Sequence, residues 1–170
     1  MSKFVAGWHV IYTRPRHEKK VAVGLTDAAI NYFLPMTKVM RTWHDRRKVV
    51  DTPLFQSYVF VYLKNLHDYY AGLHCSGALY FLRFGQETAR VNDRIITNMR
   101  LLLQVGSEVE VSSGNFEPGQ QLLIREGPLT GVSCEVVQAA RQKKILVRVH
   151  LISRNLLITM PSEFLVSATA

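Results

Sequence analysis

The sequence contains few cysteines and none of the short motifs that mark common catalytic sites. Cys75 and Cys134 stand far apart, without the paired spacing of a zinc or dithiol redox site, so we expect reduced thiols and a cytoplasmic protein. There is no glycine-rich phosphate loop, no pair of histidines at helical spacing and no local Ser or Cys nucleophile motif. The sequence therefore predicts a protein that is not an enzyme and that uses no metal or cofactor.

Long apolar runs are also missing. No segment reaches the roughly 20 apolar residues that cross a bilayer, and the first residues, MSKFVAGWHV, lack the apolar stretch of a signal peptide. Hydrophobic residues nevertheless make up 48% of the 170 residues, which is enough for packed cores. We expect a globular protein of one or two domains with no membrane partner.

Acidic residues are scarce in the first part of the chain. Residues 1–105 hold 15 Lys and Arg but only 7 Asp and Glu, a net charge of +8, whereas residues 106–170 hold 6 of each sign. A basic excess confined to one part indicates a face for a polyanion, most often nucleic acid. Charge that only increases solubility would give the same balance.

The segment LFQSYVFVYL, residues 54–63, predicts a strand with two different faces. Neighbouring side chains of a strand point to opposite sides, so Val59, Val61 and Leu63 share an aliphatic face that suits a core. The opposite face is either a second packed layer under helices or a surface pocket for a partner. That aromatic face consists of Tyr58, Phe60 and Tyr62, with Phe55 in the preceding turn.

Strands and helices alternate through the rest of the first part. The apolar periodicity of residues 16–31 predicts a helix that buries one face, made of Val21, Leu25, Ala28, Ala29 and Tyr32. Asp93 is the expected N-cap of the last helix. This order predicts an α+β fold with helices packed on an antiparallel sheet. The expected strands are 8–12, 33–40, 49–53, 58–63 and 79–84, and the expected helices are 16–31, 65–74 and 93–104.

Two short segments concentrate the basic residues. Cations at the start of a helix oppose its dipole, so those of TRPRHEKK indicate either a bound anion or plain solvated charge; they are Arg14, Arg16, Lys19 and Lys20. The second segment, RTWHDRRK, is the expected loop of a hairpin. It is a candidate nucleic-acid finger, since cations contact phosphates and a ring can stack on an unpaired base, or it is an ordinary solvated turn. Its candidate residues are Arg41, Trp43, His44, Arg46, Arg47 and Lys48.

The last third of the chain differs from the first part in its composition and in its expected secondary structure. Residues 107–115 have the polar, Ser- and Gly-containing composition of a linker. Closely spaced strands without room for helices follow and predict a small barrel, whose neutral charge suits docking to a protein. The strand candidates include 121–124, 133–137, 144–150 and 155–160.

These segments together resemble a known family. FEPGQQLLIREGPLTGVSCEVV, residues 116–137, resembles the KOW motif of NusG-type transcription elongation factors, and WHVIYTRPRHEKK, YFLPM, WHDRRK and PLFQSYVFV resemble their NGN domain. The similarity is greatest to the specialised UpxY-like paralogs that antiterminate capsular polysaccharide operons. It implies an NGN-like domain at 1–106, a linker at 107–115 and an SH3-like KOW β-barrel at 116–170.

The resemblance also implies partners. NGN domains of this family bind the clamp helices of the RNA polymerase β′ subunit through a hydrophobic depression, with the β subunit as a further candidate contact. Their basic face meets the non-template DNA strand, and the KOW domain recruits another protein, for which a ribosomal protein and Rho are candidates. We expect a monomer. The positions matching the polymerase-binding depression are Tyr12, Phe55, Tyr58 and Phe60.

Three positions depart from the family pattern. Its usual Pro and Gly before Tyr58 are here Gln56 and Ser57, and the second glycine of the KOW pattern after Gly131 is here Cys134, which removes backbone freedom. Some related paralogs hold the KOW domain as a helical hairpin against the NGN pocket. The β-branched residues of 144–160 favour strands instead, so we expect a constitutive barrel and an open pocket.

The function expected from this resemblance is regulation of transcription elongation and antitermination, specific to certain operons. The alternative is an RNA-binding or ribosome-associated KOW protein. An aromatic pocket of NGN type separates the two hypotheses, because a ribosomal KOW module needs no polymerase-docking domain before it.

Overall fold

A computed structural model describes residues 4–43, 46–104, 109–112, 119, 121–124, 133–138, 142–149, 154–161 and 165–167. The chain divides into two compact units, residues 1–96 and 97–170. Within these residues no helix is long and apolar enough to cross a membrane.

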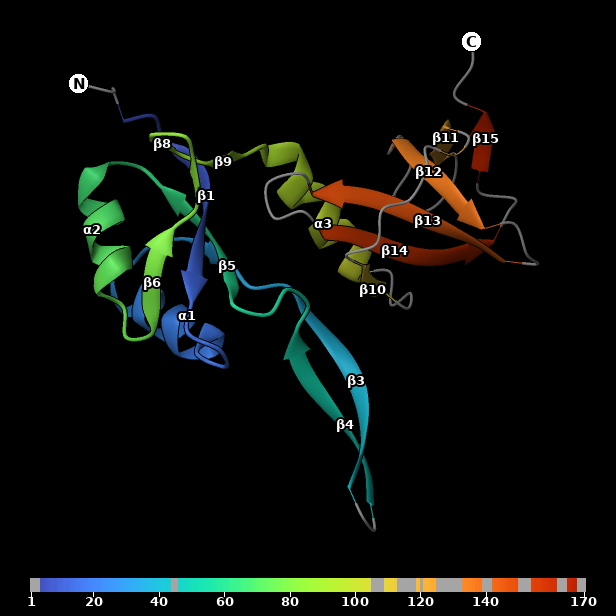
Figure 1. Cartoon of the computed structure of the whole chain (residues 1–170), viewed down its shortest axis with the longest axis horizontal. Coiled ribbons are helices and arrows are strands. Elements are labelled where there is room, and N and C mark those ends of the chain that lie inside the picture. Colours follow the sequence, from blue (N-terminus) through green and yellow to red (C-terminus); the bar gives the residue numbers. More distant parts are fainter. Residues whose placement is uncertain are drawn as a thin grey trace. The chain divides into compact units, whose positions relative to one another are not determined.

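An antiparallel sheet forms the centre of the first unit (Figure 1). Its strand order is β2-β5-β1-β6, and β9 also pairs with β1. This confirms the predicted antiparallel sheet. The strands are β1 (Gly7–Thr13), β2 (Tyr32–Phe33), β5 (Tyr58–Leu63), β6 (Ala78–Phe81) and β9 (Arg90–Val91).

Helices α1 (Glu18–Asp27) and α2 (Leu66–His74) pack on the aliphatic face of this sheet. Asn65 caps α2, because its side chain accepts a hydrogen bond from the backbone N–H of Asp68 at 2.9 Å. The predicted aliphatic face is confirmed as a core face. The buried cluster on this face consists of Ile11, Val21, Leu25, Ile30, Val59, Val61, Leu63, Cys75 and Phe81.

Helix α1 is shorter than the predicted helix 16–31. It ends at Asp27 because Ala29 adopts a left-handed conformation with φ 55°. The N–H of Ala29 then bonds to Thr26 O and that of Ile30 to Leu25 O, the pattern of a Schellman C-cap. The predicted burial of Ala28 and Ala29 on a helical face is therefore wrong; both are exposed, and Tyr32 belongs to β2.

The predicted strand 33–40 is divided, since Phe33 belongs to β2, and its part from Met36 onward joins the predicted loop 41–48 in a much longer hairpin than expected. Strands β3 (Met36–Trp43) and β4 (Arg46–Pro53) pair along their whole length, from Met36 opposite Pro53 to Trp43 opposite Arg46. The hairpin extends away from the first sheet as a separate two-stranded ribbon (Figure 1). The expected long basic loop is thus mostly strand, and its His44 lies outside the described residues.

Short elements follow β6. The predicted strand 79–84 is broken, since β6 ends at Phe81 and β7 (Arg83–Phe84) pairs instead with β8 (Glu87–Thr88). Helix α3 (Asp93–Gln104) has the predicted bounds. Its first turn is capped by Asn92, whose side chain accepts from the N–H of Arg94 at 2.8 Å, rather than by the predicted Asp93.

The second unit contains an antiparallel sheet in the order β10-β14-β13-β12-β11-β15. Strand β10 falls within the segment predicted as a linker and pairs with β14. The closure of these strands into an SH3-like KOW barrel stays a prediction, as do the domain boundaries. The strands are β10 (Val109–Ser112), β11 (Gln121–Ile124), β12 (Ser133–Gln138), β13 (Gln142–Val149), β14 (Arg154–Pro161) and β15 (Leu165–Ser167).

Candidate partner-binding surface

Three tyrosines lie side by side on the aromatic face of the first sheet. Tyr12 on β1 stands opposite Tyr58 on β5 and opposite Tyr80 on β6. The Tyr12 ring stacks on Tyr80 with centroids 5.1 Å apart and meets Tyr58 edge-on at 5.4 Å. Tyr80 is 51% exposed, and the other two are half-buried. This tyrosine row, Tyr58, Tyr12 and Tyr80, forms a partly exposed aromatic surface.

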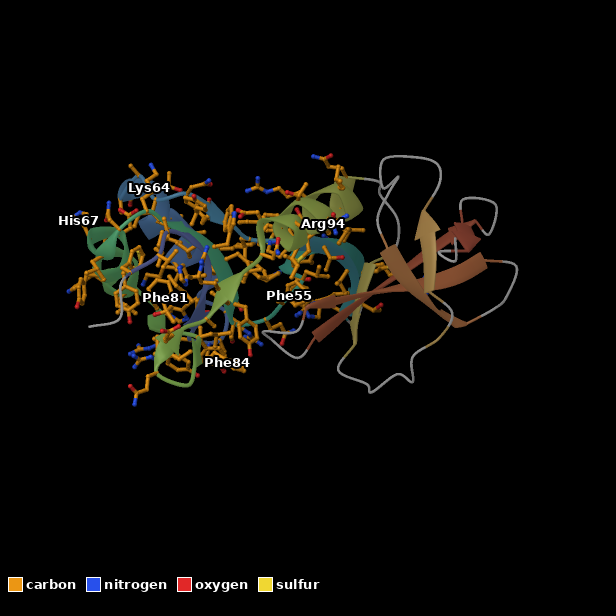
Figure 2. The ribbon with its side chains drawn as sticks, turned by 90° about the horizontal axis from the view of Figure 1, so that it is seen from above. Phe55, Lys64, His67, Phe81, Phe84 and Arg94 are labelled. Carbon is orange, nitrogen blue, oxygen red and sulfur yellow. The ribbon has the colours of Figure 1, made fainter. Side chains whose placement is uncertain are left out.

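The two predicted phenylalanines lie beneath the surface. Phe55, labelled in Figure 2, is 2% exposed. Phe60 is fully buried, and the two rings meet edge-on at 5.9 Å. Direct surface contact was expected for Phe55, and its burial corrects that expectation. Phe60, for which core and pocket both remained open, lies in the core. The two rings form a packed layer that holds β5 and the turn before it.

That turn is fixed by a buried carboxylate. Glu18, in the first turn of α1, is 4% exposed, and its Oε1 accepts a hydrogen bond from the N–H of Ser57 at 2.7 Å. Ser57 O in turn accepts from the N–H of Thr13 at 2.9 Å. Ser57 has φ 65°, a left-handed conformation that favours glycine. Ser57 therefore adopts this conformation although the family pattern has glycine at its position.

The first group of predicted nucleic-acid-binding residues lies where β1 leads into α1. All four cations are exposed, and Arg16 has φ 65° just before the helix. Lys19 Nζ donates to the backbone oxygen of Asp51 in β4 at 3.2 Å, which ties the start of α1 to the hairpin. This group consists of Arg14, Arg16, Lys19 and Lys20.

The second group lies along the outer half of the β3–β4 hairpin. Its described members are all exposed, and the Trp43 side chain is 68% exposed. The structure thus places the predicted cations in two groups, at the start of α1 and on the hairpin. The described members of the second group are Arg41, Trp43, Arg46, Arg47 and Lys48.

Sequence patterns do not reveal two residues on which this surface depends, Tyr80 and Glu18. Tyr80 lies in a short edge strand with no extended alternation, so only its pairing with Tyr12 brings it into the row. Glu18 was one acidic residue within a basic segment, and nothing local shows that it reaches Ser57, 39 residues away. In the described part of the chain no cluster of His, Cys, Asp or Glu could hold a metal ion.

Comparison with known proteins identifies relatives of this fold. A family model described as "Transcription termination factor nusG" matches residues 6–100. The structure "Domain interaction in Thermotoga maritima NusG" aligns with a TM-score of 0.60 and 17% identity, covering 97% of this chain and 98% of that chain. "Crystal Structure of MjSpt4:Spt5 complex conformation B" aligns with a TM-score of 0.34 and 12% identity, covering 96% and 97%. The Thermotoga similarity indicates a shared fold.

Proposed function

Because this chain belongs to the NusG family of transcription factors, we propose that it regulates elongation by binding bacterial RNA polymerase and suppressing pausing or termination. Holding a processivity factor against polymerase requires binding surfaces and no covalent chemistry. The finer assignment, antitermination at particular operons such as those for capsular polysaccharide, rests on the resemblance to UpxY-like paralogs.

The tyrosine row is the observation that carries this proposal. Large aromatic rings that are partly exposed are typical anchors of protein interfaces. A partner helix laid on the sheet would pack its apolar face on Tyr12 and Tyr80, and the clamp helices of the polymerase β′ subunit are the proposed partner. Phe60 lies two residues from Tyr58 on the same face of β5 and packs against Phe55, so the row borders a buried aromatic pair.

Exposed cations within the two groups support a second contact, with the non-template DNA strand. Lys and Arg supply the phosphate contacts that dominate affinity for nucleic acids. The polymerase β subunit is a further proposed contact. The second unit, whose sequence resembles a KOW domain, is proposed to recruit a separate protein, with a ribosomal protein and Rho as candidates. A monomer suffices for all of these contacts.

A pull-down of core RNA polymerase by the full-length protein tests the proposal. The wild type should retain polymerase, and Tyr12→Ala should lose most of it. Tyr70→Ala is the matched control, because Tyr70 is 58% exposed but lies on α2, which covers the opposite face of the sheet. A wild-type protein that captures ribosomes and not polymerase would refute the proposal.

A further inference from the structure

The β3–β4 hairpin has two faces of different chemistry. In a pair of antiparallel strands, directly opposed residues share a face and successive residues alternate between faces. The register pairs Arg41 with Lys48 and Trp43 with Arg46, and these two pairs are two residues apart. All four side chains therefore lie on one side of the hairpin. We call this set, Arg41, Trp43, Arg46 and Lys48, the basic face.

The opposite face carries much less net charge. Thr42 is paired there with Arg47, and Lys38 stands opposite Asp51, so that this cation has an acidic neighbour. Between these pairs lie Met40, 63% exposed, and Val49, 55% exposed. Along the described strands the basic face therefore holds three cations and no anion, whereas the opposite face holds two cations and one anion. Polyanion affinity should be concentrated on the basic face.

The cations of the basic face destabilise the isolated hairpin. Like charges directly opposite each other, as Arg41 and Lys48 are, destabilise a pair of strands. A two-stranded hairpin is only marginally stable without further packing, and β3 and β4 form a sheet of their own. No described acidic side chain forms an ion pair with these cations. An anion bound between the Arg41 and Lys48 side chains would remove the repulsion between them.

The exposed ring narrows the class of anion. Trp43 is 68% exposed at the outer end of the basic face, opposite Arg46. A base can stack on such a ring only when it is unpaired, because in a duplex both faces of the base are already covered. A ring beside three cations therefore fits a single strand better than a duplex or an acidic peptide.

We propose that single-stranded nucleic acid binds along the basic face of the hairpin, with its phosphates on Arg41, Arg46 and Lys48 and one unpaired base stacked on Trp43. Arg47 takes no part, although it lies between two of these cations in the sequence. This inference rests on the proposed function and deepens it, since it assigns the nucleic-acid contact of the hairpin to one face.

The same substitution at two adjacent positions distinguishes the contributions of the two faces to binding. Arg46→Gln and Arg47→Gln each remove one exposed Arg charge, from the basic face and the opposite face respectively. Binding of a fluorescein-labelled 12-nucleotide single-stranded DNA to the full-length protein is measured by anisotropy over a range of salt. R46Q should make the slope of log affinity against log salt shallower by about 0.7, the value for one single-strand phosphate. R47Q should keep the wild-type slope.

Substitutions of Trp43 test the stacking of a base on its ring. Trp43→Ala should weaken binding on the order of tenfold, within the range for loss of one base–ring contact, and leave the salt slope unchanged. Trp43→Tyr keeps a ring and should restore most of the affinity, which separates stacking from damage to the hairpin. Tryptophan fluorescence should be quenched by the DNA in the wild type and in R47Q, and not in W43Y.

Three outcomes would overturn the inference: equal slope changes in R46Q and R47Q, unchanged affinity in W43A, or no binding of the single strand by the wild type. Polymerase pull-down of the same variants keeps the two proposals distinguishable. If the wild type captures polymerase but R46Q and R47Q change the salt slope equally, only the inference fails. If the faces differ as expected but polymerase is not captured, the proposed function fails and the hairpin site stands.

Discussion

The carboxylate of Glu18 accepts a hydrogen bond from the backbone of Ser57 at 2.7 Å, and both residues are buried. This contact joins the start of α1 to the turn between Phe55 and Tyr58. Ser57 is held there at φ 65°, where a residue with a side chain is less stable than glycine. Glu18 is therefore a positioning residue for the aromatic surface, because it stabilises a turn that the chain alone disfavours.

The first prediction follows from this contact. Glu18→Gln replaces a charge-assisted hydrogen bond with a weaker one and should lower the free energy of unfolding by about 1–3 kcal/mol. It should also weaken polymerase binding, since the Tyr58 end of the row loses its fixed position. Urea denaturation and polymerase affinity measure the two effects on the full-length protein.

Ser57→Gly provides the rescue. Glycine adopts the left-handed conformation without strain, so the turn should persist in the E18Q/S57G double variant and polymerase affinity should return toward that of the wild type. A lost hydrogen bond that affected only general stability would not be rescued in this way. Affinity in E18Q/S57G that stays as low as in E18Q would contradict a positioning role.

The second prediction separates binding from stability on the aromatic face. Tyr80→Ala should weaken polymerase binding by roughly 1–2 kcal/mol and change the unfolding free energy little, because its side chain is 51% exposed. Phe55→Ala should instead destabilise the fold by about 3–5 kcal/mol, the usual cost of a large cavity in a core. Thermal unfolding and polymerase affinity of both variants test this division. Similar effects of the two substitutions on stability would contradict it.

The third prediction concerns pH and His9. His9 is 2% exposed, and its Nδ1 lies 3.0 Å from the backbone oxygen of Ala89. Burial lowers the pKa of His9 below its ordinary value of 6.5; backbone hydrogen bonds with Ala89 and Val5 oppose this shift, and nearby Arg90 adds to it. The folded state thus binds a proton less readily than the unfolded state. Stability should be full above pH 6.5 and fall below it, down to the lowered pKa of the folded state.

Urea denaturation at pH 8 and pH 5.5 measures this change. His9→Gln should reduce the difference in unfolding free energy between the two pH values, because the substituted side chain does not titrate. His67→Gln is the control, since His67 is exposed on α2, and it should retain the wild-type difference. An equal pH dependence in H9Q and the wild type would remove His9 as the cause.

The first sheet and its aliphatic core follow from local sequence patterns. Alternation along β5 fixes which side chains share a face, and the periodicity of 16–27 places Val21 and Leu25 inward. The end of α1 could not be predicted in the same way. Ala29 is an ordinary helix former, and only the need to turn into β2 places it in the left-handed conformation.

The site was less predictable than the fold because it depends on pairing between distant segments. Composition alone marks RTWHDRRK as basic, but only the register of β3 and β4 separates Arg46 from Arg47. Sequence likewise places Tyr58 and Phe60 on one face of β5, whereas packing buries Phe60 and leaves Tyr58 half-exposed. Tyr80 joins the row through a four-residue strand that carries no pattern of its own.

The last prediction concerns the fold of the second unit. Strands β13 and β14 pair along their whole length, and their β-branched residues disfavour a helix. Pro128 would cost about 3 kcal/mol inside a helix. We expect β-structure both in the intact chain and in a fragment of residues 106–170, which must retain β10 because β10 pairs with β14. Circular dichroism of the fragment should equal the difference between the spectra of the full-length protein and of residues 1–105. Extra helical signal in the intact chain alone would mean that the second unit refolds against the first and that the tyrosine row is covered until a partner displaces it.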